Sequence, residues 1–361
     1  MTGSIPGGRS IVFPCGQTMK NQFMLAPLTN CQSNPDGSLS DDEFRWLAMR
    51  AQGGFGLTMT CAAHIQAVGR GFPGQLGIFS DELLPGHQRL AQAIAQEGSL
   101  AVIQLHHAGI RTPAKLVTEQ IVGPSDDKER GARALTTLEV ETLREDFILA
   151  ADRAQAAGYH GVEIHGAHGY IIAQFLSSEV NRRKDKYGGP LENRSRLLFE
   201  ILDGIRQRCG SSFLIGVRLS PERFGMKLSE ILEISQQLID SNQMDFLDLS
   251  LWDCFKQPEE AEHQGRSLLE HIMELDRGPV KLTVAGKIHS ATDVRDILQQ
   301  GVDFVTVGRA GILHHDYPLQ VMADPSFQPI SLPVTSAHLK AEGLGPDFID
   351  YLGRWDGFVS G

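Results

Sequence analysis

Two histidines and a tyrosine lie close together in the segment His165–Tyr170, HGAHGY, which directly follows the apolar run Gly161–His165. Two imidazoles three residues apart at a strand-to-turn junction can face one pocket, and both can donate a hydrogen bond to one oxygen. The Tyr170 phenol, with a reference pKa of about 10, keeps its proton at neutral pH. The spacing fits catalytic donors, metal ligands or buried structural histidines equally well.

A metal site would need a third or fourth ligand, and His106 or His107 could supply one. The sequence has no HExxH motif. The flanking residues Gly166, Ala167 and Gly169 are small, which is typical of a backbone that a ligand approaches closely. We therefore expect no metal here, and a metal-dependent barrel hydrolase remains the weaker alternative.

Eight short apolar runs recur along the chain, separated by longer amphipathic segments. Their continuous apolar character is typical of strands covered on both faces, as in a parallel sheet. The predicted strands are Met24–Leu28, Gly56–Ala62, Leu100–Leu105, Gly161–His165, Leu214–Ser220, Phe246–Leu251, Lys281–Gly286 and Phe304–Arg309. The predicted helices are Asp41–Gln52, Gly86–Gln96, Thr136–Ala157, Asn193–Arg208, Lys227–Asp240, Ser267–Leu275 and Ser290–Gln299.

This alternation predicts an α/β protein, a single closed (β/α)8 TIM barrel spanning residues 1–361 with elaborated strand-to-helix loops. An open doubly wound sheet is the alternative, but no GxGxxG motif follows any predicted strand. Residues 63–83 and 106–135 are expected to be long loops. In a barrel such loops lie on the catalytic face, where the strands end.

The residues at the predicted strand ends are mostly polar or glycine: they are Thr29, Ala62, Gln104, His165, Arg218, Gly286 and Arg309. The loops after the seventh and eighth strands form the common phosphate site of barrels. Gly286, Lys287 and Gly308 would let backbone amides approach a phosphate, and Arg309 would add a charged fork. The alternative is two ordinary strand ends with a solvated arginine.

Composition sets the broad class of the protein. Its 361 residues include 33 basic and 44 acidic ones, a net charge of −11, which argues against a nucleic-acid-binding surface. No apolar run approaches the roughly 20 residues that a membrane helix needs, and residues 1–8 lack the apolar core of a signal peptide. Five scattered cysteines without a CxxC pair indicate reduced thiols. We expect a cytoplasmic protein without nucleic-acid or membrane partners.

Several of these segments together resemble the Old Yellow Enzyme family of FMN-dependent NAD(P)H:flavin oxidoreductases and ene-reductases. The most specific is residues 165–196, HGAHGYIIAQFLSSEVNRRKDKYGGPLENRSR. Supporting motifs are APLT at 26–29, GFPGQLGIFSDE at 71–82, QLHHAG at 104–109, GVRLSP at 216–221, AGKIHS at 285–290 and GVDFVTVGRA at 301–310. The resemblance covers roughly residues 10–325, and it implies an FMN-binding (β/α)8 barrel.

The resemblance implies specific roles for the matching residues. The FMN phosphate would lie on the amides of Gly286, Lys287, Gly308 and Arg309. The flavin ring would be bordered by the segment Ala26, Pro27, Leu28 and Thr29, with Thr29 at its O4 edge, and by Ala62, Gln104 and Arg218. His165 and His168 would donate hydrogen bonds to the substrate carbonyl oxygen, and Tyr170 would protonate the α-carbon.

The implied reaction is a ping-pong cycle. NADH or NADPH would pass a hydride to flavin N5 and leave, and an electron-poor alkene such as an α,β-unsaturated ketone or aldehyde would then accept it. A flavoprotein acting on another small substrate, or a flavin-binding protein without turnover, remains an alternative, because one fold and cofactor serve many reactions.

The sequence departs from the family pattern at three places. Ile110 stands where the family often has arginine, with Arg111 one place later, and Cys61 stands where an acidic residue is common. Residues 326–361 form a C-terminal extension that matches nothing in the family and could cover the barrel mouth or mediate self-association.

Overall fold

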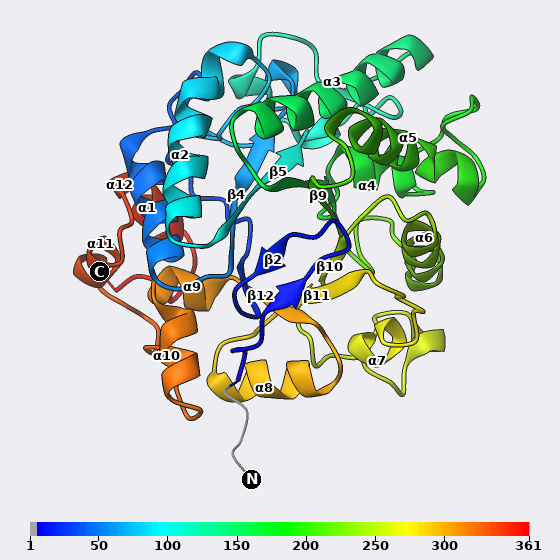
Figure 1. The fold of residues 1–361 in the computed structure, drawn as a ribbon. Coiled ribbons are helices and arrows are strands. Elements are labelled where there is room, and N and C mark those ends of the chain that lie inside the picture. The colour runs from blue at the N-terminus through cyan, green and yellow to red at the C-terminus, as the bar shows by residue number, and fades with distance from the viewer. Residues whose placement is uncertain (1–5, 361) are drawn as a thin grey trace.

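The computed structural model describes residues 6–360, and its centre is a closed eight-stranded barrel (Figure 1). The strands follow the order β10-β11-β12-β3-β4-β5-β8-β9, and every neighbouring pair is parallel. They are β3 (Phe23–Leu25), β4 (Leu57–His64), β5 (Leu100–His106), β8 (Gly161–Gly166), β9 (Leu214–Leu219), β10 (Phe246–Ser250), β11 (Lys281–Ala285) and β12 (Phe304–Val307). The predicted TIM barrel is confirmed, and the doubly wound alternative is wrong.

Helices lie between the barrel strands and surround them. They are α1 (Asp41–Gln52), α2 (Leu84–Gln96), α3 (Thr137–Ala156), α4 (Ile171–Leu176), α5 (Leu191–Cys209), α6 (Leu228–Asp240), α7 (Leu268–Ile272), α8 (Ala291–Gln299), α9 (Arg309–Leu313), α10 (Tyr317–Ala323), α11 (Ser336–Ala341) and α12 (Pro346–Leu352). All seven predicted helices are present. Helix α3 begins with a capping box, in which Thr136 Oγ1 accepts from Glu139 N and Glu139 Oε2 accepts from Thr136 N.

Some predicted boundaries are wrong, and the errors gather at the carboxyl ends of strands. Strand β3 ends at Leu25 instead of Leu28, and β12 ends at Val307 because Arg309 already begins helix α9. The expected long loops contain the short 3-10 helices η1 (Ala67–Gly69), η2 (Asp81–Leu83), η3 (Gly109–Arg111) and η4 (Ala114–Leu116). The second of these loops also contains two short paired strands, β6 (Val122–Gly123) and β7 (Arg133–Ala134). A further 3-10 helix, η5 (Ala261–His263), follows β10.

The barrel interior changes from apolar at the amino ends of the strands to polar at their carboxyl ends. Side chains alternate between the two faces of a strand. In β10, Leu247 and Leu249 accordingly pack in the outer core with the helices, whereas Phe246 belongs to a separate inner cluster. Asp248 and Ser250, on the inward face, follow Phe246 toward the barrel mouth. The polar groups are thus gathered at one end of the barrel.

An N-terminal hairpin closes the apolar end. Its strands β1 (Ile11–Val12) and β2 (Thr18–Met19) are antiparallel, and in Figure 1 they lie across the barrel. Phe13, between them, packs against Phe246 at 5.9 Å and Phe304 at 5.8 Å between ring centroids. Gly216 makes room for this aromatic cluster, because a Cβ there would lie 2.1 Å from Phe246 Cζ. The closed end is therefore a packed core that no ligand can enter.

The C-terminal segment packs beside helix α1. Trp46 of α1 meets Phe348 of α12 edge to face, with ring centroids 5.0 Å apart. The buried guanidinium of Arg50 donates to the carbonyl oxygens of Gly311, Ile312 and Glu342. These contacts hold the segment against the same side of the barrel as α9.

Within residues 6–360, none of the helices combines the length and the apolar character needed to cross a bilayer. Residues 1–5, part of the stretch expected to lack a signal peptide, lie outside the described residues.

Replacing Gly216 with alanine should lower the free energy of unfolding by about 1–3 kcal/mol, because the added methyl group overpacks the aromatic cluster. Phe246→Leu removes the atoms that the methyl group would meet, so the double variant should be more stable than the sum of the two single effects predicts. Urea denaturation of the three variants measures the coupling. Additive effects would show that Gly216 does not make room for Phe246.

Candidate active site

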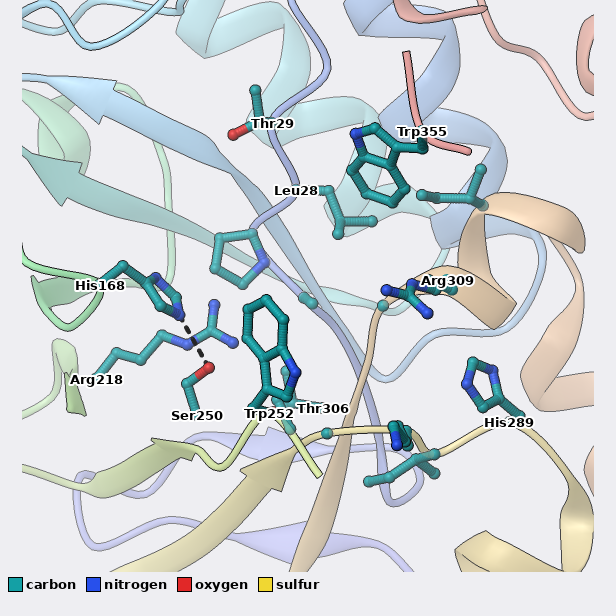
Figure 2. A pocket seen from close by; sticks show the side chains of 18 of the residues that line it. Leu28, Thr29, His168, Arg218, Ser250, Trp252, His289, Thr306, Arg309 and Trp355 are labelled. Carbon is teal, nitrogen blue, oxygen red and sulfur yellow. Dashed lines mark hydrogen bonds between the residues drawn. The ribbon is translucent and has the colours of Figure 1, made fainter. Parts of the chain in front are cut away.

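The described surface has a cavity of about 340 Å³ at the carboxyl ends of the barrel strands. Its lining comes from the loops after β3, β8 and β10 to β12, and from the C-terminal segment. Figure 2 shows His168, Arg218 and Ser250 on one side of the cavity and His289 and Arg309 on the other. The cavity therefore presents hydrogen-bonding or cationic groups at two separated places.

One end of the cavity is formed by the predicted phosphate-binding residues. Gly286 has φ +153°, and a Cβ there would lie 2.8 Å from Asp253 N, so this turn requires glycine. At Gly308 an added Cβ would meet only Leu28 Cδ2, at 3.8 Å, and the backbone faces open space. Lys287 Nζ is 2.8 Å from Asp253 Oδ2, whereas Arg309 is exposed above the Trp355 ring. Two backbone segments and an arginine thus converge here.

The other end of the cavity contains Arg218 and His168. Arg218, from β9, is only 5% exposed, and its Nε lies 3.0 Å from Asp248 Oδ2. His168 has φ +58° and donates its backbone N–H to Ser220 Oγ, which fixes the turn after β8. Its Nε2 lies 2.9 Å from Ser250 Oγ, as the dashed line in Figure 2 shows.

The two histidines of the HGAHGY motif form a chain of hydrogen bonds. His165 Nδ1 accepts from Ala167 N at 3.4 Å, which leaves the proton on Nε2. That nitrogen lies 3.4 Å from His168 Nδ1, so His168 carries its own proton on Nε2 and donates it to Ser250. Burial, with a contribution from Arg218, lowers the pKa of His168 to about 3 and the pKa of His165 well below its ordinary value. Both rings are neutral donors.

Tyr170 lies behind this pair and is not part of the cavity lining. Its ring packs against His106 at 4.4 Å and His165 at 5.2 Å between centroids. Burial raises the pKa of the phenol, and the charge of Arg111 partly opposes that shift. Tyr170 therefore keeps its proton over the physiological range.

The structure brings ten of the predicted site residues into one cavity: Ala26, Pro27, Leu28, Thr29, His168, Arg218, Gly286, Lys287, Gly308 and Arg309. Ala62, Gln104, His165 and Tyr170 are outside its lining. Gln104 is turned into the barrel interior, where its Nε2 donates to Glu163 Oε1 at 2.7 Å. The Ala62 carbonyl oxygen accepts from Gln75 Nε2.

The departures from the family pattern have local explanations. Ile110 is buried, and its backbone N–H donates to Gln174 Oε1. Arg111 reaches the histidine loop instead, where its Nη1 donates to the His168 carbonyl oxygen at 3.0 Å. The Cys61 thiol donates to the Ala62 carbonyl oxygen, and the nearby buried carboxyl group of Glu43, from helix α1, raises the pKa of the thiol together with burial and accepts from Asn30 Nδ2.

Several lining residues were missed by the sequence analysis. Ser250 ends the sixth barrel strand, so the strand-end rule could have found it. Trp252, two residues further along the chain, is 63% exposed beside the cavity. Tyr351 and Trp355 come from the C-terminal extension, where the resemblance gives no signal. His289 follows the predicted phosphate loop by two residues.

A metal-type arrangement occurs elsewhere among the described residues. Glu260, Glu262 and His263 are the one group there with three potential ligand atoms within 4.8 Å of one another. The histidines at the barrel mouth do not form such a group.

Comparison with known proteins identifies the family. The model of the NADH:flavin oxidoreductase / NADH oxidase family matches residues 14–324. A probable NADH-dependent flavin oxidoreductase of Bacillus subtilis, YqiG, is 37% identical over 320 residues, which are 86% of each chain. An NADH:fumarate oxidoreductase of Klebsiella pneumoniae is 31% identical over 326 residues, but these are only 35% of that longer protein.

Solved structures agree in fold over nearly the whole chain. The Old Yellow Enzyme homologue from Zymomonas mobilis superposes with a TM-score of 0.78 at 27% identity, covering 93% of this chain and 96% of that one. A point mutant of morphinone reductase in complex with tetrahydroNAD gives 0.77 at 25% identity, with 94% and 95% covered. The resemblance inferred from the sequence motifs is confirmed. This chain belongs to the NADH:flavin oxidoreductase / NADH oxidase family, the Old Yellow Enzyme family, and is an oxidoreductase that uses FMN and NADH or NADPH.

Proposed function

We propose that this protein reduces the C=C bond of electron-poor alkenes, such as α,β-unsaturated ketones and aldehydes, with NADH or NADPH as the reductant. The observation that carries the proposal is a neutral imidazole, His168, in the wall of the cavity that Arg218 and the two glycine turns also line. A neutral donor beside a hydride source suits a reaction that builds negative charge on a carbonyl oxygen.

The cavity residues fit FMN. Gly308 leaves its backbone open to a phosphate, Gly286 makes the tight turn beside it, and Arg309 and His289 stand at the same end. The buried Arg218 lies at the other end, where its guanidinium would face the ring. Thr29 and Leu28 line the cavity between them. FMN supplies two-electron hydride chemistry when bound, and the nicotinamide and the alkene would use the cavity in turn, in ping-pong order.

His168 donates a hydrogen bond to the alkene's carbonyl oxygen, and His165 would become the second donor by turning its Nε2–H from His168 Nδ1 to the same oxygen. The His168 Nε2–H reaches Ser250 Oγ at 2.9 Å, and the carbonyl oxygen would take the place of that acceptor. His165 holds His168 in the donor tautomer through the contact between the two rings. Preplaced donors stabilise charge without reorganisation at the moment of reaction.

Tyr170 is the proton donor to the α-carbon. Its ring is held by His106 and His165, and Arg111 donates to the backbone of the same loop. Because the Tyr170 ring packs against His165, its hydroxyl would serve an alkene that is bound against the histidines. Saturation of the double bond then ends with proton transfer from the phenol.

Arg309→Ala should weaken FMN binding at least tenfold, because a charge-assisted contact to the phosphate is lost. Fluorescence titration of the apoprotein measures the dissociation constant, and riboflavin, which has no phosphate, is the control ligand. Equal losses for FMN and riboflavin would contradict the phosphate assignment.

Tyr170→Phe should slow alkene reduction about 10²-fold or more, because a general acid contributes about 10²- to 10⁴-fold. Reduction of the flavin by NADH or NADPH should be nearly unchanged. Stopped-flow spectroscopy with cyclohexenone measures the two half-reactions separately.

Tyr159→Phe is the matched control for this test. Tyr159 is buried beside His87, to which its hydroxyl hydrogen-bonds, and it precedes β8 at the opposite end of that strand. Equal slowing of both half-reactions in Tyr170→Phe would assign the tyrosine to packing or nicotinamide binding. Absence of enone reduction in the wild type would favour a flavoprotein acting on another substrate.

His168→Ala should lower the rate of alkene reduction about 10²- to 10³-fold, the usual effect of losing one oxyanion donor. His168→Asn, which keeps an N–H group, should lose less. His160→Asn is the control, since His160 precedes β8 at the far end and accepts from Ala101 N. If His168→Ala slows the oxidation of NADH by the flavin but not the reduction of the alkene, the imidazole does not contact the alkene.

A further inference from the structure

Two carboxyl groups and one guanidinium are buried together in the barrel interior, directly below the cavity. Glu163 of β8 and Asp248 of β10 are both 0% exposed, and Arg218 of β9 lies on the strand between them. The proposed function places Arg218 against the flavin ring but uses neither acid. A pair of buried acids beside one cation therefore needs a separate explanation.

The contacts within this trio are asymmetric. Arg218 Nε lies 3.0 Å from Asp248 Oδ2, so the cation is paired with the aspartate. Glu163 Oε1 accepts from Gln104 Nε2 at 2.7 Å, while Glu163 Oε2 has no donor. Both Asp248 carboxyl oxygens are likewise buried without a hydrogen-bond donor. An ionised carboxylate only accepts hydrogen bonds, so these buried oxygens without donors favour a protonated acid in the group.

Charge and burial lead to the same conclusion. Two ionised acids beside Arg218 would leave a net negative charge in the barrel interior, where unpaired charge is strongly unfavourable. Burial and the charge of Asp248 raise the pKa of Glu163, and the Asp248 pKa is also raised by burial although Arg218 opposes the shift. Glu163, farther from the cation in this pairing, is the better place for the proton.

We propose that Glu163 and Asp248 hold one proton between them at neutral pH, and that this pair sets the net charge that Arg218 presents to the bound cofactor. The proposal rests on the assignment of Arg218 to the flavin side of the cavity. Glu163 and Asp248 are positioning residues, because they act through Arg218.

The remaining neighbours of the pair do not compete for this proton. His165 and His168 are neutral, Gln104 and Thr306 are uncharged, and burial raises the pKa of the Cys254 thiol beyond the physiological range. With one proton on the pair, the trio is electrically neutral. Loss of that proton as the pH rises adds a negative charge below the cavity and makes reduction less favourable.

The test is the pH dependence of the midpoint potential of the FMN-loaded wild type and of Glu163→Gln, from about pH 6 to about pH 9. Because glutamine resembles a protonated glutamate, the two potentials should agree near neutrality. At a pH high enough for the pair to have lost its proton, reduction of the flavin in the wild type returns a proton to Glu163. The equilibrium constant for reduction of the flavin should then fall by a further factor of ten per pH unit. For a two-electron couple, this is a further drop of about 30 mV in the midpoint potential.

The matched control is Asp245→Asn. Asp245 is also buried and ion-paired, with Arg206 Nη2 at 2.9 Å, but it precedes β10 at the closed end of the barrel. This variant should lower stability without changing the slope of the potential against pH. A changed slope in Asp245→Asn would mean that the effect does not belong to the Glu163–Asp248 pair.

An infrared difference spectrum of the apoprotein gives a readout that does not depend on flavin chemistry. Wild type minus Glu163→Gln at neutral pH should show the carbonyl stretch of a protonated carboxylic acid. A missing band, or a higher potential of Glu163→Gln near neutrality, would overturn the proposal, since both mean that Glu163 is ionised. If the wild type does not reduce alkenes but the band is present, the proposed reaction is wrong and the proposed protonation of the Glu163–Asp248 pair stands.

Discussion

The site depends on one buried cation, the guanidinium of Arg218, held within the interior of a closed barrel. Removing such a charge from water is unfavourable unless a counter-charge accompanies it. Asp248 provides that counter-charge at 3.0 Å, and Glu163 adds a second acid whose proton keeps the group neutral. This requirement explains why the inward positions of β10 change from the apolar Phe246 to the acidic Asp248 halfway along the barrel.

The barrel encloses its polar layer because its other end is sealed. The hairpin residue Phe13, with Phe246 and Phe304, fills the interior near the amino ends of the strands. Water is thereby excluded from below, so the electrostatic interactions of Arg218 with a ligand are screened only from the mouth. The low pKa of His168 has the same physical origin, since a second positive charge near Arg218 in a poorly solvated wall is unfavourable.

Much of this arrangement followed from the sequence. Strand and helix identities were predictable because apolar runs and the Thr136–Glu139 capping box are local signals. Strand ends were less predictable: Ala26–Thr29 and Gly308 continue an apolar pattern, yet they leave the barrel to line the cavity. The direction of Gln104 toward Glu163, and the position of Tyr351 and Trp355, depend on contacts between distant segments, which periodicity does not record.

Tyr351 and Trp355 reach the cavity from a segment beyond residue 324, where the family match ends. The groups proposed for catalysis and phosphate binding, by contrast, come from strand ends that the barrel itself fixes. A rim built from a separate, peripheral segment can change in size and shape without disturbing the reacting groups. Differences in ligand selectivity among close relatives are therefore expected to follow differences in their C-terminal segments. A comparison restricted to the shared barrel would miss them.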